Sequence, residues 1–130
     1  FYAEVDLTYD PRIADEKNEL RVVNDQRGAP TYTKDLALAI KTLIDNNCRG
    51  IYHAANSGSC TWYDFAVEIL KLYGLEKKIV PITTEEVARP AKRPVFSVFN
   101  CEKLKSDTGF VLRDWKEALA EYMAGRQRRE

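Results

Sequence analysis

TWYDFAVEILKLYGLEKKIVPI, residues 61–82, carries the clearest pattern in the chain: an amphipathic helix followed by a strand. Thr61 and Asp64 have the spacing of a capping box, with Asp in place of the usual Glu. Apolar residues then recur at helical spacing until Gly74, which ends the helix. Residues 79–82 indicate a strand at a sheet edge, because their proline has no N–H to donate to a neighbour.

Weaker patterns on both sides of this stretch complete an alternating order of strands and helices. The further expected strands are residues 20–23, 51–55 and 95–99. The further expected helices are one from a Thr33 cap to Asn46, one short turn at 83–86, one over 101–108 up to Gly109, and one from an Asp114 cap to Gly125. The expected buried face of the last helix consists of Trp115, Ala118, Leu119, Tyr122 and Met123. This alternation predicts an α/β fold with at least some parallel strand pairing.

The composition is that of a globular chain, with 45% apolar and 31% charged residues. Twenty Lys and Arg offset twenty Asp and Glu, so no broad field attracts nucleic acid or an anionic membrane. No apolar run approaches the roughly 20 residues of a membrane-spanning helix. Three cysteines without a Cys-x-x-Cys pair, and a single histidine, argue against a zinc site and favour a reducing compartment, the cytoplasm.

The chain is expected to form one domain over residues 19–130, because nothing between residues 20 and 123 has the composition of a linker or a repeat. Residues 1–18 form an N-terminal segment without a clear pattern. The chain begins at Phe1 with no initiator Met, so we expect it to be part of a longer protein.

Two loops carry side chains suited to binding a ligand. Residues 24–31, NDQRGAPT, place amides, a carboxylate and a guanidinium at the end of a strand, where ligands bind in open α/β sheets. Residues 89–94, RPAKRP, hold two arginines between prolines, and arginine can form paired hydrogen bonds with a phosphate or diphosphate. The alternative for residues 24–31 is a turn whose polar side chains bind one another, and the alternative for residues 89–94 is an ordinary exposed basic loop. Trp62, at a helix N-terminus after a glycine loop, either faces a ligand or anchors the core.

Signals for catalysis within this chain are weak. Cys60 and His53 could form a thiol nucleophile pair, but no third group that would orient them is identifiable. Tyr73 and Lys77 match the Tyr-x-x-x-Lys spacing of a known catalytic pair, but Gly74 ends the helix between them, so the match is due to chance. No Gly-x-Gly-x-x-Gly turn occurs. We therefore expect no catalytic, cofactor-binding or metal-binding residue in this chain.

Four segments taken together resemble dTDP-4-dehydrorhamnose reductases, which belong to the extended short-chain dehydrogenase/reductase superfamily. They are LRVVNDQRGAPT (20–31), GIYHAANSG (50–58), TWYDFA (61–66) and RPAKRPVFSV (89–98). The resemblance runs from about Glu19 to Met123 and covers only the C-terminal, substrate-binding part of that family. It implies the C-terminal portion of an NAD(P)-binding Rossmann-like fold with mixed short strands and helices.

The resemblance implies an NAD(P)H-dependent oxidoreductase of dTDP-rhamnose biosynthesis, which supplies cell-surface polysaccharide. The reaction would reduce the 4-keto group of dTDP-4-dehydro-L-rhamnose with NADPH or NADH, giving dTDP-L-rhamnose. The family's glycine-rich cofactor turn and catalytic Thr/Tyr/Lys group belong to its N-terminal half, which we expect to be the partner of this chain. The family also allows a homodimer and a magnesium ion.

The same resemblance implies a set of substrate-binding residues in the two loops and beside them. Gln26 and Thr31 would contact the nucleotide-sugar, and Arg93 would bind its diphosphate. The full expected set is Gln26, Thr31, Trp62, Arg89, Arg93 and Ser97. Asp25 would instead hold its loop by accepting hydrogen bonds from neighbouring backbone N–H groups.

Two alternative functions stay open at the level of sequence. One is a non-catalytic regulatory or binding module on the same scaffold, like the regulatory subunit of methionine adenosyltransferase. The other is a related nucleotide-sugar reductase or epimerase that acts on a different sugar. An intact Tyr-x-x-x-Lys pair and glycine-rich turn elsewhere in the protein would favour an enzyme.

Overall fold

The computed structural model describes residues 19–87, 91 and 93–127, which fall into two compact units. The strand unit comprises the described residues within Phe1–Gly28 and Cys60–Ser97, and the helical unit comprises those within Ala29–Ser59 and Val98–Glu130. The N-terminal segment 1–18, which shows no pattern in the sequence, lies outside the described residues.

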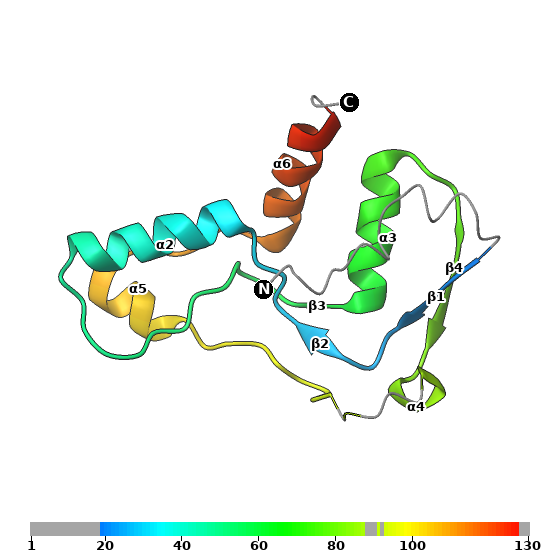
Figure 1. The fold of residues 1–130 in the computed structure, drawn as a ribbon, viewed down its shortest axis with the longest axis horizontal. Helices are drawn as coiled ribbons and strands as arrows, with labels where there is room; N and C mark the ends of the chain where they lie inside the picture. The colour runs from blue at the N-terminus through cyan, green and yellow to red at the C-terminus, as the bar shows by residue number, and fades with distance from the viewer. Residues whose placement is uncertain (1–18, 88–90, 92, 128–130) are drawn as a thin grey trace. The chain divides into compact units, whose positions relative to one another are not determined.

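The strand unit is built on two parallel strands and the helix that leads into the second strand (Figure 1). Strand β1 (Glu19–Val23) pairs along its whole length with β4 (Lys78–Ile82). Parallel neighbours need a crossover connection, and α3 (Trp62–Tyr73) lies in that connection and contacts both strands. The predicted α/β fold with parallel pairing is therefore confirmed.

Helix α3 begins and ends where the sequence predicts. The hydroxyl of Thr61 accepts a hydrogen bond from the N–H of Asp64 at 3.0 Å, and the Asp64 carboxylate accepts one from the N–H of Thr61 at 3.0 Å. This capping box satisfies N–H groups that have no partner within the helix. Gly74 follows Tyr73 with φ 67°, the left-handed conformation that suits glycine. Lys77 thus lies beyond the helix, and its spacing from Tyr73 is a chance match, as expected.

Two short strands form where the sequence indicates a turn and a helix start. Strand β2 (Arg27–Gly28) pairs antiparallel with β3 (Cys60–Thr61). Cys60 accordingly lies in a strand rather than at a helix start. The expected short turn at 83–86 forms as α4 (Thr84–Val87).

Two expected strands are absent from the described part of the chain. Residues 51–55 have no strand partner among the described residues, and Ile51 at their start is 83% exposed. Of residues 95–99, only Phe96 pairs, in an isolated bridge with Arg27. Both predictions were wrong for the described residues, because alternation of side chains forms a strand only where a neighbouring backbone completes the hydrogen bonds.

The helical unit packs around a small apolar cluster. Its helices are α2 (Thr33–Asp45), α5 (Glu102–Thr108) and α6 (Trp115–Gln127). The cluster consists of buried Ala39, Leu104 and Leu112, with Leu43, Tyr52, Ala54 and Phe110 partly buried against it. Among the helices of the described residues, none combines the length and the apolar character needed to cross a membrane.

The helix ends in this unit follow the sequence in part. Asp114 accepts a hydrogen bond from the N–H of Lys116 at 2.8 Å, so its expected role as the cap of α6 is confirmed. Thr33 is not a cap, because α2 already begins there and the capping position belongs to Tyr32, whose side chain makes no capping bond. Helix α6 continues past Gly125, where an end was expected.

The buried face of α6 is close to the expected one. Trp115, Ala118, Leu119 and Met123 are buried. Tyr122 is 42% exposed, which corrects its expected burial. Its ring instead meets the ring of Tyr32 edge-on, with centroids 5.9 Å apart.

Candidate functional site

The backbone of Arg27 brings three of the expected substrate-binding residues together in the strand unit. Gln26 immediately precedes Arg27 in the chain. Arg27 pairs antiparallel with the residue before Trp62 and forms a parallel bridge with the residue before Ser97. The loop after β1, the start of α3 and the segment around Ser97 are distant in the sequence, and they therefore meet at Arg27.

Ser97 is fixed by its hydrogen bonds to Arg27. Its N–H donates to the carbonyl oxygen of Arg27 at 2.9 Å, and its hydroxyl donates to the same oxygen at 3.3 Å. The N–H of Arg27 donates in turn to the carbonyl oxygen of Val95 at 2.8 Å. A Cβ on Gly28 would stand 3.3 Å from the Ser97 hydroxyl oxygen, so the two segments approach closely. Arg93, two residues before Val95, has an exposed side chain.

The loop after β1 is anchored to the start of α4 by Thr84. The Asp25 carboxylate accepts hydrogen bonds from the hydroxyl of Thr84 at 2.6 Å and from its N–H at 2.9 Å. These two bonds, the hydroxyl bond foremost, lower the pKa of Asp25. The side-chain amide of Gln26 donates to the Thr84 hydroxyl at 2.9 Å. Asp25 thus accepts from a backbone N–H, but that N–H belongs to Thr84, far along the chain, which corrects the expectation of neighbouring N–H groups.

Trp62 is partly exposed at the start of α3, next to a residue that contacts this loop. The hydroxyl of Thr61 donates to the side-chain oxygen of Asn24 at 2.9 Å, which ties the end of β1 to the start of α3. Trp62 follows directly and is 40% exposed. It meets the ring of Phe65 edge-on, with the centroids 6.5 Å apart. The exposure favours a ligand-facing side chain over a core anchor.

The structure gives no support to a thiol nucleophile. Cys60 is 4% exposed within β3, so its thiol is not accessible as a nucleophile would need to be. His53, in the helical unit, stacks on the ring of Phe99 with centroids 4.7 Å apart. Within residues 19–87, 91 and 93–127, no group of three His, Cys, Asp or Glu side chains is placed to hold a metal ion.

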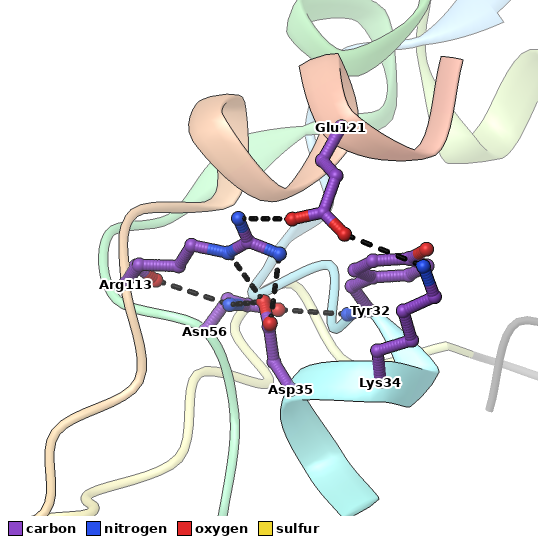
Figure 2. Close-up of polar contacts among 6 residues, drawn as sticks. All are labelled: Tyr32, Lys34, Asp35, Asn56, Arg113 and Glu121. Atoms are coloured by element: carbon purple, nitrogen blue, oxygen red, sulfur yellow. Dashed lines mark hydrogen bonds and ion pairs between the residues drawn. The ribbon is translucent and has the colours of Figure 1, made fainter. Parts of the chain in front are cut away.

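Thr31 belongs to the helical unit, where Asn56 binds it (Figure 2 shows the surrounding network). The Thr31 hydroxyl accepts a hydrogen bond from the N–H of Asn56 at 3.3 Å and donates to the carbonyl oxygen of Ala29 at 3.1 Å. The side-chain oxygen of Asn56 accepts from the N–H of Tyr32 at 2.7 Å. Asn56 therefore fixes two consecutive residues of the segment that enters α2.

An ion pair with a buried carboxylate supports Asn56 from the other side. The carboxylate of Asp35 accepts two hydrogen bonds from the Arg113 guanidinium, at 2.8 and 2.9 Å, and one from the side-chain amide of Asn56 at 2.8 Å (Figure 2). Arg113 also pairs with Glu121 at 2.6 Å. Burial opposes ionisation of Asp35, but the hydrogen bonds from Arg113 and Asn56 outweigh it and lower the pKa of that carboxyl.

Sequence reasoning missed this network. Asp35 stands in the first turn of α2, as predicted, but its position there suggests only a favourable interaction with the helix dipole. Asn56 ends the apolar run 51–55, and an amide at the end of such a run was the available signal for a buried polar group. Nothing in the sequence pairs Arg113 with Asp35, because they are 78 residues apart.

The expected substrate-binding residues are thus distributed over both units. Gln26, Trp62, Arg93 and Ser97 lie in the strand unit, Thr31 lies in the helical unit, and Arg89 lies outside the described residues. Their roles toward a substrate stay predictions.

Comparison with known proteins identifies relatives over almost the whole chain. The model of a family described as "RmlD substrate binding domain" matches residues 11–128. The spore coat polysaccharide biosynthesis protein SpsK of Bacillus subtilis is 47% identical over 115 residues, which are 88% of this chain and 40% of that protein. The chain therefore spans about two fifths of the length of such relatives.

Solved structures show the same likeness in three dimensions. A dTDP-4-dehydrorhamnose reductase from Clostridium acetobutylicum superposes with a TM-score of 0.87 at 46% identity, over 90% of this chain and 42% of that one. A dTDP-4-dehydrorhamnose reductase from Bacillus anthracis, solved in complex with NADP, gives a TM-score of 0.84 at 35% identity, over 88% of this chain and 41% of that one. The fold expected from the resemblance, part of an extended short-chain dehydrogenase/reductase, is confirmed.

Proposed function

This chain belongs to the family of RmlD substrate binding domains, and on that premise we propose that it is the nucleotide-sugar-binding part of a dTDP-4-dehydrorhamnose reductase. The reaction is the reduction of the 4-keto group of dTDP-4-dehydro-L-rhamnose. The observation that carries the proposal is the close likeness to the Clostridium acetobutylicum reductase over nine tenths of the chain. The family model spans both units, which supports treating residues 19–130 as one substrate-binding part.

The geometry of the strand unit supports nucleotide-sugar binding at the residues around Arg27. Gln26, Trp62 and Ser97 belong to the segments that meet there, so an amide, a partly exposed aromatic residue and a hydroxyl lie on one framework. Such a mixture of apolar surface and a few fixed polar groups is typical of small-molecule sites. Arg93 supplies the cationic group that a diphosphate requires, and its guanidinium can donate two parallel hydrogen bonds to phosphate oxygens.

The cofactor and the proton donor belong, in this proposal, to the remainder of a longer protein. A nicotinamide cofactor supplies the hydride, and the Bacillus anthracis reductase in complex with NADP supports NADPH or NADH in this role. The 130 residues contain no Gly-x-Gly-x-x-Gly turn, so they do not fit the cofactor. The task of this chain is to bind the substrate and orient its keto group. A cytoplasmic location, a homodimer and a bound magnesium ion stay predictions.

The test is a reductase assay on the protein as its own gene encodes it. Oxidation of NADPH is followed by absorbance with dTDP-4-dehydro-L-rhamnose as the substrate, and dTDP binding is measured by calorimetry. We expect turnover that depends on the keto-sugar. The Arg93→Ala variant should bind dTDP more weakly by about 1.5–3 kcal/mol, the usual contribution of a hydrogen bond to a charged group.

Arg49→Ala is the matched control, because Arg49 is an exposed arginine of the helical unit outside the candidate site. It should leave dTDP affinity unchanged. Binding of dTDP without turnover would instead support a non-catalytic module on the same scaffold. Turnover of a different nucleotide-sugar, with none of this one, would support a related reductase or epimerase. Wild-type affinity in Arg93→Ala would remove Arg93 from the site.

A further inference from the structure

We propose that Asn56 is a positioning residue that fixes Thr31 for contact with the substrate, and that the Asp35–Arg113 ion pair holds Asn56 in the required orientation. The inference rests on the proposed function, because it concerns a residue expected to contact the nucleotide-sugar. All four residues lie in the helical unit. Asn56, Asp35 and Arg113 are not among the residues expected to bind the substrate.

The hydrogen bonds of Asn56 show why it controls the loop. Asn56 is 2% exposed, and its N–H and side-chain oxygen bind Thr31 and Tyr32 in succession. Its side-chain amide donates both of its N–H bonds, one to Asp35 at 2.8 Å and one to the carbonyl oxygen of Arg113 at 3.1 Å. A buried amide whose donors and acceptor are all hydrogen-bonded has one favourable position, so the segment at Thr31 and Tyr32 is fixed as well.

The ion pair determines which way the Asn56 amide faces. The Asp35 carboxylate and the Arg113 carbonyl oxygen only accept hydrogen bonds, so the amide nitrogen must face them. The amide oxygen is then directed to the N–H of Tyr32, as Figure 2 shows. Arg113 binds Asp35 through two hydrogen bonds and keeps it ionised, which maintains the acceptor.

Stability alone is a poor reason for this ion pair. Burying a charged pair costs desolvation that its own attraction often fails to repay, and apolar side chains of similar volume serve equally well for packing. Buried polar groups can instead select one geometry, and here the geometry selected is that of the chain at Thr31 and Tyr32. The placement of this network against the entry to α2 therefore points to control of that segment.

The consequence for Thr31 is a hydroxyl with a defined direction. Its O–H donates to the carbonyl oxygen of Ala29, and one of its lone pairs accepts from the N–H of Asn56. Within the described residues, a second lone pair remains available, because a hydroxyl has one donor and two acceptor positions. Thr31 would thus meet the nucleotide-sugar as an acceptor of a hydrogen bond from a hydroxyl group of the ligand.

The test is a double-mutant cycle on the affinity for dTDP-L-rhamnose, measured by calorimetry on the protein as its gene encodes it. The variants are Asn56→Ala, Thr31→Val and the two combined. Each single change should weaken binding about fivefold to tenfold, as expected for one hydrogen bond. If Asn56 acts through Thr31, the combined variant should bind no more weakly than Thr31→Val, because interacting sites are not additive.

Thr108→Val is the control for a general loss of stability. The Thr108 hydroxyl also joins two backbone groups of the helical unit, at Leu104 and Phe110, but it touches neither Thr31 nor Asn56. It should lower the melting temperature and leave the affinity unchanged. If Asn56→Ala does not fold, Arg113→Lys replaces it in the cycle. This change keeps the positive charge but loses the paired hydrogen bonds to Asp35. It should weaken binding when made in the wild type, but not when made in Thr31→Val.

The outcomes separate this inference from the proposed function. Wild-type protein that does not bind dTDP-L-rhamnose overturns both. Wild-type protein that binds, combined with unchanged affinity in Asn56→Ala or with losses that add in the combined variant, overturns the positioning role alone.

Discussion

Replacing Arg113 by methionine removes the partner of a buried carboxylate while keeping a long apolar side chain. Asp35 is 6% exposed and accepts two hydrogen bonds from the Arg113 guanidinium. Of the partners of this carboxylate that Figure 2 shows, only Asn56 would still donate a hydrogen bond to it in the variant. A buried charge would then lack its counter-charge, which is one of the few situations in which a single substitution is strongly destabilising.

The expected loss of unfolding free energy is about 2–4 kcal/mol. Hydrogen bonds to charged groups contribute roughly 1.5–3 kcal/mol each, and breaking a buried ion pair costs about 3–5 kcal/mol. The lower part of that range applies here, because the Arg113 side chain is 31% exposed and the pair is partly solvated. Glu121→Gln is the matched control: Glu121 binds the other side of Arg113, its side chain is 45% exposed, and a much smaller loss than in Arg113→Met is expected.

The loss should also depend on pH in a defined direction. The network lowers the pKa of Asp35, so its contribution is present above the ordinary carboxyl pKa of about 3.9 and is lost as pH falls through the lowered value. In Arg113→Met, only the hydrogen bond from Asn56 opposes the effect of burial on Asp35, and we expect the pKa of Asp35 to rise. The difference in stability between wild type and variant should therefore be largest near neutral pH and should shrink as pH falls toward about 4.

Urea denaturation followed by far-ultraviolet circular dichroism, at pH 7 and at pH 4, measures both effects. The reasoning would be refuted by a loss below about 1 kcal/mol at pH 7, the range of an exposed ion pair. It would equally be refuted by a loss that does not change between the two pH values, because the cost would then not arise from the charge of Asp35.

Three further predictions concern local structure. In thermal denaturation, Gly58→Ala should destabilise the protein by about 1–3 kcal/mol more than Gly74→Ala does. Both glycines have positive φ, but only at Gly58 would an added Cβ stand 2.8 Å from the Asp114 carboxylate. Equal effects of the two substitutions would contradict this. Thr61→Val should cost about 1–2 kcal/mol in urea denaturation through loss of the capping box, and no change would argue against the cap. Cys60→Ser should leave kcat of the reductase nearly unchanged, and complete loss of activity in a folded variant would restore the thiol hypothesis.

The helices were predictable because their signals are local. The capping box at Thr61 and Asp64 and the left-handed Gly74 lie within one short stretch, and each acts on the nearest turn of α3. The alternating order of elements also predicted at least some parallel strand pairing, and the structure shows this pairing between β1 and β4.

Features that depend on distant backbone were not predictable from local patterns. Residues 51–55 have the composition of a strand and no strand partner in the described part of the chain, whereas Arg27 and Gly28 form a strand because Cys60 and Thr61 lie beside them. A loop of turn-forming residues can therefore pair when a neighbour is present, and an apolar run cannot pair when none is.

The same distinction applies to the candidate site. The two loops were recognisable as binding segments from their residue types, and the structure shows how Gln26 and Ser97 come near each other through Arg27. The partners of Asn56 and Arg113 were not recognisable, because the residues of this network are up to 78 positions apart in the sequence.

The most direct measurement of substrate binding by this chain is a nuclear magnetic resonance titration of the isotopically labelled protein with dTDP-L-rhamnose. The account predicts that the indole N–H of Trp62 and the side-chain amide of Gln26 shift in proportion to occupancy, while the backbone amides of α5 stay unchanged. Saturation without any shift at Trp62 or Gln26, or shifts confined to α5, would contradict the assignment of nucleotide-sugar binding to this site.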